Sequence, residues 1–421
     1  MHRRSALLLA VVLLLLFPIG AGARPAASAE EVGLSQERLA RIGQALTRQI
    51  DEGSFPGAVA LVARQGRIAY FEAFGQLDPK TGAPMPKDAI FRLYSMTKPF
   101  TSVAAMILVE EGRLRLMDPV GVYLPELAKL EVAVPSTEAS GEPTYTLVAA
   151  ERPVTVYDLL RHTSGMVYAG FTRTAYVKEL YTKANVGWAG VTPAEQIAGL
   201  AKVPLAHQPG TMWEYGLSTD VLGRVVESVT GTPLGRFLDD RLFRPLRMTE
   251  TTFHVPADKV QRLAQPFATD RATDKPITLH DVTVAPKNDA GGAGAAGTAM
   301  DYARFLHMLA NGGQLDGQRV LARTSVRHMT SDHLGDIKPA IPLLPAGYGF
   351  GLGFAVRRAD GLNGTLGSAG EYSWGGAAGT SFWVDPKEQL VAILMAQAQP
   401  GPWQRQFREL FRQLVYQAIV D

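Results

Sequence analysis

The chain has 421 residues, of which 46% are hydrophobic and 19% are charged, a composition typical of soluble globular proteins rather than of disordered or collagen-like chains. Lys and Arg total 42 and Asp and Glu total 40, and this near-balance argues against a nucleic-acid-binding protein, which needs a positively charged surface. The absence of cysteine excludes disulfide bonds, thiolate metal sites and a thiol nucleophile.

The N-terminus has the layout of a secretory signal peptide. Arg3 and Arg4 precede an unbroken apolar run over residues 6–17, and small-residue A-x-A sites follow that end at Ala23 and Ala29. The apolar run has about 12 residues, whereas a transmembrane helix needs roughly 20. We therefore expect an exported protein, periplasmic or secreted, that is cleaved near Ala29 or Ala23 and keeps no stable membrane anchor. The arginine pair is compatible with both the general and the twin-arginine export routes.

The mature chain is predicted to begin with an amphipathic helix. Ser35 can cap this helix, and apolar residues recur at helical spacing over residues 39–50. Two strands, 58–63 and 68–74, follow with a Gln-Gly turn between them.

The segment Ser95-Met-Thr-Lys98 is the strongest candidate for chemistry. Pro99 lacks a backbone N–H and is tolerated only in the first turn of a helix, which places Ser95 at a helix start. Because residues i and i+3 are neighbours on a helix, Lys98 can bring its amine to the Ser95 hydroxyl, and the positive helix end disfavours an ammonium ion there. A serine needs such a base to act as a nucleophile. Alone, the pattern also fits an N-cap serine with a chance lysine.

Several aromatic residues, among them Tyr168 and Phe171, lie between residues 166 and 188. They fit either the core of a helical region or an apolar wall for the acyl or alcohol group of a substrate. Tyr168 and Phe171 are therefore candidates for substrate binding.

Tyr215-Gly-Leu-Ser218 leads into a predicted helix through residues 222–226. A phenol can relay a proton when a neighbouring cation lowers its pKa from the usual value of about 10. The alternative interpretation is a buried core tyrosine.

Residues 292–297, Gly-Ala-Gly-Ala-Ala-Gly, match the G-x-G-x-x-G pattern of dinucleotide-binding loops. Such a site also needs flanking strands, the second of which carries an acid at its end, and no buried strand follows in register. Thr298 and Asp301 instead predict a capping pair for a helix over residues 302–309. We interpret the segment as a structural loop.

Other signatures of metal or cofactor chemistry are missing. The sequence has no G-x-S-x-G, H-E-x-x-H or Walker pattern. Its eight histidines are scattered, and His328 and His333 lie off a common helix face. We expect neither a metal nor an organic cofactor.

Trp374-Gly375-Gly376-Ala377 enters a predicted strand over residues 380–384. Glycines there allow a substrate to lie against the strand edge, and a backbone N–H can face a developing oxyanion. The alternative is a β-bulge or a loop.

The C-terminal region predicts a hairpin of strands 381–384 and 390–395, followed by a helix with an apolar stripe over 407–414. Both ends of the chain therefore carry a helix and antiparallel strands, whereas residues 95–310 are mostly of helical pattern.

These elements predict an α/β (α+β) two-domain architecture, with an antiparallel sheet flanked by helices, built from both chain ends, and an inserted, mostly helical domain. Residues 1–29 are assigned to the signal peptide, 30–100 and 285–421 to the sheet domain, and 101–284 to the helical domain. We expect the active site at the interface of the two domains.

In this order, Ser95-x-x-Lys98, Tyr215-x-Leu217 and the Gly-rich strand resemble the serine β-lactamase and penicillin-binding protein superfamily over about residues 35–415. The flanking Leu-Arg-His-Thr-Ser-Gly at 160–165 and the Asp-Pro-Lys-Glu-Gln-Leu-Val tail at 385–391 look similar too. Within that superfamily the chain looks most like the class C β-lactamase-like family VIII carboxylesterases. Those enzymes carry Trp-Gly-Gly where β-lactamases carry Lys-Thr-Gly. Residues 131–153 look like a family-variable insertion.

The resemblance implies a fold of the β-lactamase/transpeptidase type and a role for each site residue. Lys98 and Tyr215 deprotonate Ser95, which attacks an ester carbonyl, and the backbone N–H groups of Ser95 and Ala377 stabilise the oxyanion. Tyr215 then protonates the departing alcohol, and water cleaves the acyl-enzyme. Trp374, Gly375, Gly376 and Leu217 join the substrate-binding candidates.

Two departures from the β-lactamase pattern favour esters as substrates. Class C β-lactamases have Asn where this chain has Leu217, and Lys where it has Trp374, so a β-lactam carboxylate loses two expected partners. We expect small-molecule esters with a small or short acyl group to be the substrates and β-lactams to be at most weak ones. The alternatives are a β-lactamase, a D-amino-acid peptidase of the penicillin-binding type, and a non-catalytic cell-wall binding or sensing protein. The oligomeric state stays open.

Overall fold

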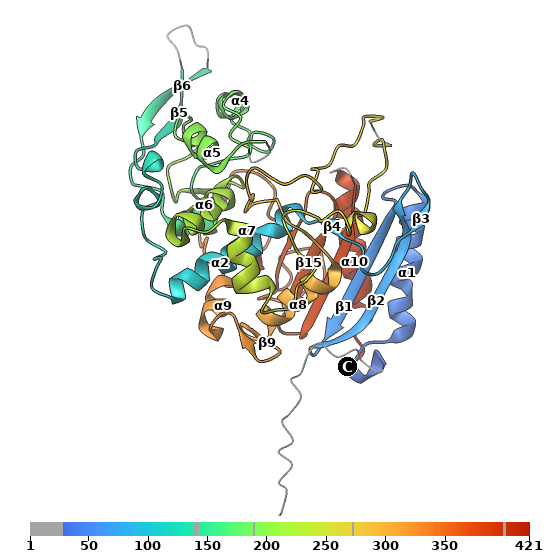
Figure 1. The fold of residues 1–421 in the computed structure, drawn as a ribbon. Helices are drawn as coiled ribbons and strands as arrows, with labels where there is room; N and C mark the ends of the chain where they lie inside the picture. Colours follow the sequence, from blue (N-terminus) through green and yellow to red (C-terminus); the bar gives the residue numbers. More distant parts are fainter. Residues whose placement is uncertain (1–27, 138–142, 188–189, 272, 399–400) are drawn as a thin grey trace, which may run out of the picture.

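The computed structural model describes residues 28–421 apart from 138–142, 188–189, 272 and 399–400, so the predicted signal peptide lies almost entirely outside the described residues. Its central element is an eight-stranded antiparallel sheet with strands from both ends of the chain (Figure 1). In spatial order the strands are β12 (Tyr348–Phe350), β13 (Ala355–Arg357), β14 (Tyr372–Gly375), β15 (Ser381–Asp385), β16 (Leu390–Ala396), β1 (Gly57–Arg64), β2 (Arg67–Asp78) and β3 (Ala83–Pro84). The predicted architecture is confirmed.

Strand β1 shows why this sheet is covered on both faces. All of its residues are buried, and successive side chains point to opposite sides of a strand. Val59 and Leu61 accordingly join the core under the helical part, whereas Ala60 and Val62 join a second core on the other face. Helices must therefore lie on both faces of the sheet.

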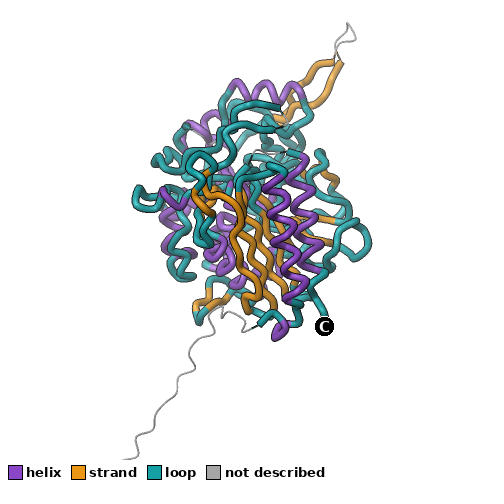
Figure 2. The backbone as a smooth tube through the Cα atoms, turned by 90° about the vertical axis from the view of Figure 1, so that its right-hand side faces the viewer, coloured by secondary structure: helices purple, strands orange, loops and turns teal. Residues whose placement is uncertain are grey.

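Two long helices cover the second face. Helix α1 (Gln36–Asp51) packs against α10 (Pro402–Tyr416), and Figure 2 shows long helices running beside the strands. The predicted cap of α1 is confirmed, because the Ser35 Oγ accepts a hydrogen bond from the Arg38 N–H at 3.3 Å. The opposite face is covered by α8 (Ala299–Ala310), which contacts β1 and β16.

The middle of the chain supplies most of the remaining helices. They are α2 (Lys98–Glu110), α3 (Val156–Leu160), α4 (Ala175–Lys183), α5 (Pro193–Leu200), α6 (Ser218–Thr230), α7 (Leu234–Leu238) with the π-helical η5 (Asp239–Phe243), and α9 (Arg323–Met329). Short 3-10 turns are η1 (Glu30–Val32), η2 (Tyr94–Thr97), η3 (Val120–Val122), η4 (Pro125–Leu127) and η6 (Val260–Arg262). The proposed domain boundaries near residues 100 and 285 stay predictions.

The segment 131–153, which the sequence analysis interprets as a family-variable insertion, contains a hairpin of β5 (Glu131–Thr137) and β6 (Pro143–Ala149). It projects from the helical part of the molecule (Figure 1). The other two-stranded pairs are β4 (Phe91–Arg92) with β8 (Ala296–Gly297), β7 (Met212–Trp213) with β11 (Lys338–Pro339), and β9 (Gln314–Leu315) with β10 (Gln318–Arg319).

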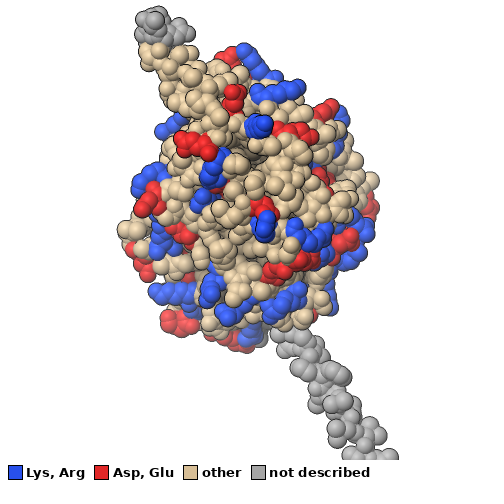
Figure 3. Space-filling model, turned by 90° about the vertical axis from the view of Figure 1, so that its left-hand side faces the viewer, with Lys and Arg blue, Asp and Glu red and all other residues tan. Residues whose placement is uncertain are grey.

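The surface carries charges of both signs. On the face shown in Figure 3, Lys and Arg side chains are interspersed with Asp and Glu side chains, without a continuous stripe of either sign. Within the described ranges, no helix combines the length and the apolar character needed to cross a bilayer.

The predicted capping pair at α8 is half correct. The Thr298 Oγ1 accepts a hydrogen bond from the Asp301 N–H at 3.2 Å. The Asp301 carboxylate, however, accepts from the Glu250 N–H and the Thr251 hydroxyl at 2.8 and 2.9 Å. Asp301 is buried against the turn at 249–251, so its oxygens satisfy buried donors of that turn.

The buried His307 of α8 is expected to make the stability of the fold depend on pH. Both of its ring nitrogens are buried without a hydrogen-bond partner among the described residues, and burial lowers its pKa to about 4. An unfolded histidine titrates near about 6.5, so the unfolded chain binds more protons below that pH. We therefore expect His307 to lower the free energy of unfolding by about 2 kcal/mol at pH 5 relative to pH 8, because each pH unit between the two pKa values is worth about 1.4 kcal/mol.

His307→Leu should remove that part of the acid destabilisation. Urea unfolding at pH 7.5 and pH 5 measures the difference for wild type and variant, with His254→Gln as a control at an exposed histidine. An unchanged difference between the two pH values would show that His307 does not contribute.

Candidate active site

Ser95 lies on the 3-10 turn η2, directly before α2. The sequence places it at the start of a helix, and the structure shows a 3-10 turn that passes into the α-helix at Lys98, with Pro99 in the first α-helical turn. Tyr94 precedes it with a φ of 46°, in the left-handed region that residues other than glycine rarely adopt. The Tyr94 hydroxyl accepts a hydrogen bond from the His280 N–H at 2.8 Å, which holds this turn.

Lys98 is fully buried, whereas Ser95 is partly exposed. The Lys98 Nζ lies 2.7 Å from the Gly292 carbonyl oxygen, 3.2 Å from the Tyr168 hydroxyl and 3.5 Å from the Ser95 Oγ. The amine therefore has three polar neighbours, one of which is the predicted nucleophile.

Tyr168 belongs to a hydrogen-bond network that the sequence did not reveal. Its hydroxyl donates to the Asp220 Oδ2 at 3.0 Å, and the Asp220 Oδ1 accepts from the Gly292 N–H at 3.1 Å. Burial raises the pKa of Tyr168 well above its usual value, and the neighbouring Asp220 acts in the same direction, so the phenol keeps its proton. Burial also raises the pKa of Asp220, opposed by the charge of Lys98.

The loop interpreted as structural thus contributes to the site. A side chain at Gly292 would overlap the Asp220 carboxylate, so only glycine allows the loop to approach Lys98 this closely. The sequence signal was present as a Gly-rich segment, but nothing local connects it to a lysine that lies 194 residues away in the chain.

Tyr215 contacts the same lysine through its ring. The Lys98 Nζ lies 4.6 Å from the Tyr215 ring centroid, in a cation–π arrangement. The Tyr215 hydroxyl accepts a hydrogen bond from the Trp374 Nε1 at 3.4 Å, and the two rings lie 5.2 Å apart. The structure therefore brings Ser95, Lys98, Tyr215 and Trp374 together, although the hydroxyl bonded to Lys98 is that of Tyr168.

The segment 160–165 packs against Tyr215 through the ring of His162. His162 is fully buried, and its ring centroid lies 4.9 Å from that of Tyr215. Burial and the charge of Lys98 hold the pKa of His162 well below its usual value, so the imidazole is neutral. Its Nδ1 accepts from the Gly216 N–H at 3.4 Å, which leaves the Nε2 to pair with the Thr219 hydroxyl at 3.3 Å.

The two glycines after Trp374 make room for protein groups. A Cβ at Gly375 would lie 3.1 Å from the Arg408 Nη1, and one at Gly376 would overlap the Leu93 carbonyl oxygen. The first glycine admits a guanidinium, and the second lets the strand approach the turn that carries Ser95.

Two backbone N–H groups near this strand are available. Among the described residues, no acceptor is hydrogen-bonded to the N–H of Ser95 or of Ala377, both of which are partly exposed. These are the two groups that the resemblance implies as an oxyanion hole.

The other substrate-binding candidates lie in different surroundings. Phe171 is 48% exposed, and its ring lies 5.8 Å from that of Tyr215 and 6.1 Å from that of Tyr168. Leu217 is buried in the main hydrophobic core, so its side chain does not reach the exposed part of the site. The roles of both residues in substrate binding stay predictions.

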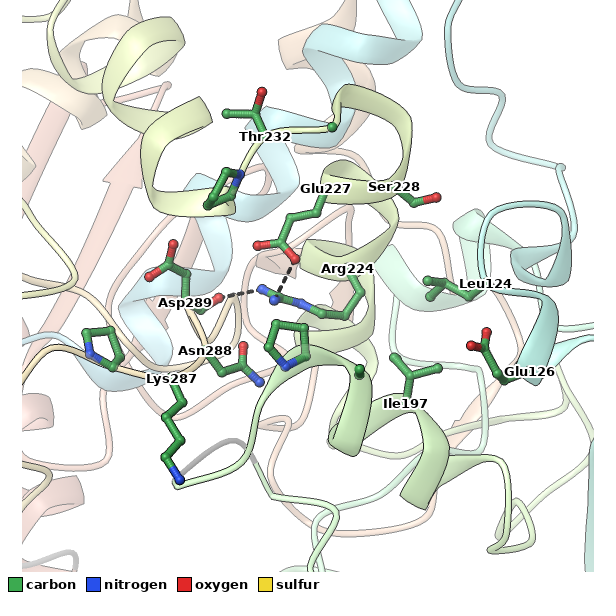
Figure 4. A pocket seen from close by; sticks show the side chains of 15 residues that line it. Leu124, Glu126, Ile197, Arg224, Glu227, Ser228, Thr232, Lys287, Asn288 and Asp289 are labelled. Atoms are coloured by element: carbon green, nitrogen blue, oxygen red, sulfur yellow. Dashed lines mark hydrogen bonds and ion pairs between the residues drawn. The ribbon is translucent and has the colours of Figure 1, made fainter.

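A cavity of about 650 Å³ with both polar and apolar lining residues lies elsewhere in the helical part, around the C-terminal end of α6 (Figure 4). Arg224 forms an ion pair with Glu227 at 2.6 Å and donates to the Asp289 carbonyl oxygen at 2.7 Å. The Arg224 side chain is therefore already paired within the protein, and Ser95 and Lys98 are not among the residues that line this cavity. In the part of the chain that the structure describes, no three His, Asp or Glu side chains are grouped to hold a metal.

The arrangement around Lys98 can activate Ser95. A neutral amine has two N–H groups and one lone pair. The Gly292 carbonyl can only accept, and the Tyr168 hydroxyl gives its own proton to Asp220, so these two neighbours take the two N–H groups. The lone pair is then left for the third neighbour, the Ser95 hydroxyl.

Comparison with known proteins gives concordant results. Residues 42–417 match the family model described as Beta-lactamase. Protein Rv1367c of Mycobacterium tuberculosis (strain ATCC 25618 / H37Rv) is 37% identical over 370 residues, which cover 85% of this chain and 90% of the relative. Esterase EstB of Burkholderia gladioli is 33% identical over 378 residues, with coverage of 85% and 89%. The solved structure of EstCE1, described as a hydrolase with promiscuous acyltransferase activity, superposes with a TM-score of 0.73 at 27% identity, covering 90% of this chain and 99% of that one.

Proposed function

Because the chain belongs to the beta-lactamase family of serine hydrolases, we propose that it is an exported carboxylesterase that cleaves small or short-chain esters through an acyl-enzyme on Ser95. The observation that carries the proposal is the contact of a partly exposed serine with a buried lysine whose other neighbours are hydrogen-bond acceptors. That contact supports catalysis over a binding or sensing role, which needs no base beside the serine.

In the proposed mechanism Lys98 takes the proton of Ser95 as the Oγ attacks the ester carbonyl carbon. The N–H groups of Ser95 and Ala377 bind the oxyanion. When the tetrahedral intermediate collapses, the Tyr215 hydroxyl gives its proton to the departing alcohol and regains one from Lys98, over whose amine its ring lies. A water molecule then attacks the acyl-enzyme by the same route and releases the acid and free Ser95.

Esters are favoured over β-lactams by the side chains at two positions. Leu217 packs into the core and Trp374 lies against Tyr215, so neither presents the amide or the ammonium group that would bind a β-lactam carboxylate. Hydrogen bonds to charged groups contribute about 1.5–3 kcal/mol each, so the loss of two corresponds to at least about a hundredfold in kcat/KM.

We therefore expect kcat/KM for p-nitrophenyl butyrate to exceed that for the chromogenic cephalosporin nitrocefin by at least about a hundredfold. Ser95→Ala should remove turnover of both substrates, which shows that they share one site. A higher kcat/KM for nitrocefin would reverse the assignment in favour of a β-lactamase.

The proposed export is supported by the sequence of the leader, and the structure bears on the choice between the two cleavage sites. Ala29 is buried in the core beneath α1 and α10, and its carbonyl oxygen accepts hydrogen bonds from the N–H groups of Val32 and Leu34 at 3.1 and 3.0 Å. Cleavage after Ala23 preserves these contacts, whereas cleavage after Ala29 removes them. N-terminal sequencing of the exported protein distinguishes the two sites.

A further inference from the structure

The turn that carries Ala377 is held by the last helix of the chain. The Arg408 Nη2 donates to the carbonyl oxygens of Gly376 and Thr380 at 2.6 and 2.8 Å, and the Gln404 Nε2 donates to that of Ala377 at 2.8 Å. Both donors come from α10, which packs on the face of the sheet opposite to α8. The carbonyl groups of Gly376, Ala377 and Thr380 therefore point toward α10.

This arrangement fixes the direction of the Ala377 N–H. The Gly376 carbonyl and the Ala377 N–H belong to one peptide unit, which is planar and trans, so the two groups point in opposite directions. Because the guanidinium holds the carbonyl on the α10 side, the N–H points to the opposite side, where Ser95 lies. On that side, Gly376 and Thr380 pack against the Leu93 carbonyl, at the start of the turn that carries Ser95. The same bond polarises the peptide unit and strengthens its N–H as a donor.

The surroundings of Arg408 suit a residue that holds the Gly376 carbonyl in place. Among the described residues, no carboxylate lies within ion-pair distance of its guanidinium. Burial lowers its pKa to about 10, so the group stays charged at neutral pH. A buried charge without an ionic partner is costly, and here the carbonyl oxygens of the turn are its acceptors. The missing side chain of Gly375 leaves the space that the guanidinium occupies.

We propose that Arg408, assisted by Gln404, is a positioning residue that orients the Ala377 N–H as an oxyanion donor. The proposal rests on the proposed function and adds to it a residue that does not touch the substrate. It also gives a physical reason for the two glycines after Trp374. Gly375 leaves space for the Arg408 guanidinium, and Gly376 lets the turn approach the Leu93 carbonyl.

The test compares Arg408→Met and Arg408→Lys with Arg405→Met. Arg405 lies on the same helix, lines the same cavity of about 410 Å³ beside Trp374, and pairs with Glu409 at 2.8 Å without touching the turn. Removing an oxyanion donor outright costs about 10²–10³ in kcat, so misdirecting one should lower kcat by about 10- to 100-fold in Arg408→Met, with KM little changed. Arg408→Lys retains the charge and should recover part of the loss, and Arg405→Met should match the wild type.

The inhibition constant of phenylboronic acid distinguishes the positioning role from a purely structural one, because a loss of stability alone would not change it. This reagent forms a tetrahedral adduct on a serine nucleophile, so its inhibition constant should rise by the same factor as kcat falls, while the thermal midpoint of unfolding stays within a few degrees. If Arg408→Met does not fold, Gln404→Leu, which removes the hydrogen bond to the Ala377 carbonyl and leaves Arg408 in place, should show the same parallel change at a smaller size.

Two results would overturn the proposal in distinguishable ways. Wild-type kcat and boronate inhibition in a folded Arg408→Met enzyme would reject the positioning role, while a fluorophosphonate adduct on Ser95 upholds the proposed function. A wild-type protein that neither hydrolyses esters nor forms that adduct would reject both together.

Discussion

Replacement of Ser95 by alanine is expected to lower kcat for ester hydrolysis by about 10⁶-fold, the size of loss known for removal of the nucleophile from a serine hydrolase. The variant retains Lys98 and both available N–H groups, so it can still bind and polarise an ester. It has no oxygen that can be acylated, however, and the reaction loses its covalent intermediate. Turnover of p-nitrophenyl butyrate by wild type and Ser95→Ala measures the loss, with circular dichroism to compare folding.

Two other serines near the site provide matched controls. Ser164 and Ser218 are fully buried, and their hydroxyl groups lie 2.8 Å apart in a mutual hydrogen bond. Ser218→Ala should lower stability, because a buried hydroxyl loses its partner, but should leave acylation of Ser95 intact. Mass spectrometry after reaction with a fluorophosphonate should show the adduct on the Ser95 peptide. An adduct on either control serine would move the nucleophile there.

The elements that the sequence predicted well are those specified by local signals. A cap at Ser35 followed by an apolar stripe defines α1, and alternating or continuous apolar runs define β1 and β16. Similar elements at both chain ends were enough to predict one sheet with an insertion. The hairpin of β5 and β6 was missed because the strands extend into solvent and carry mixed side chains.

The candidate site likewise contains residues that local spacing predicts and residues that only tertiary packing brings together. Ser95 and Lys98 lie three residues apart, so local geometry alone brings them together. The partners that complete the surroundings of Lys98 are Tyr168 and Gly292, which lie 70 and 194 residues away. Local pattern gives no reason to place an aromatic residue or a Gly-rich loop beside a particular lysine, because only the packing of α2, α6 and the loop at 290–295 creates that contact.

The pairing of Lys98 and Tyr215 leads to the second large effect. In water a lysine amine and a tyrosine phenol titrate near about 10.4 and 10, so neither alone is an effective base at neutral pH. The proposed mechanism couples them, since the proton taken from Ser95 by Lys98 leaves through Tyr215. Lys98→Met and Tyr215→Phe should each lower kcat by about 10²–10⁴-fold, and the double variant should lose little more than either single one.

Tyr168→Phe distinguishes a positioning hydroxyl from the proton carrier. It removes one acceptor from the Lys98 amine but leaves the Gly292 carbonyl and the Ser95 hydroxyl in place, so we expect a loss of only about tenfold. The kcat values of all four variants for one ester, with folding compared by circular dichroism, decide the matter. If the losses of Lys98→Met and Tyr215→Phe multiply in the double variant, the two residues act independently. If Tyr168→Phe costs more than Tyr215→Phe, the proton passes through the hydroxyl that hydrogen-bonds Lys98 directly, and Tyr215 serves as the ring on which the amine packs.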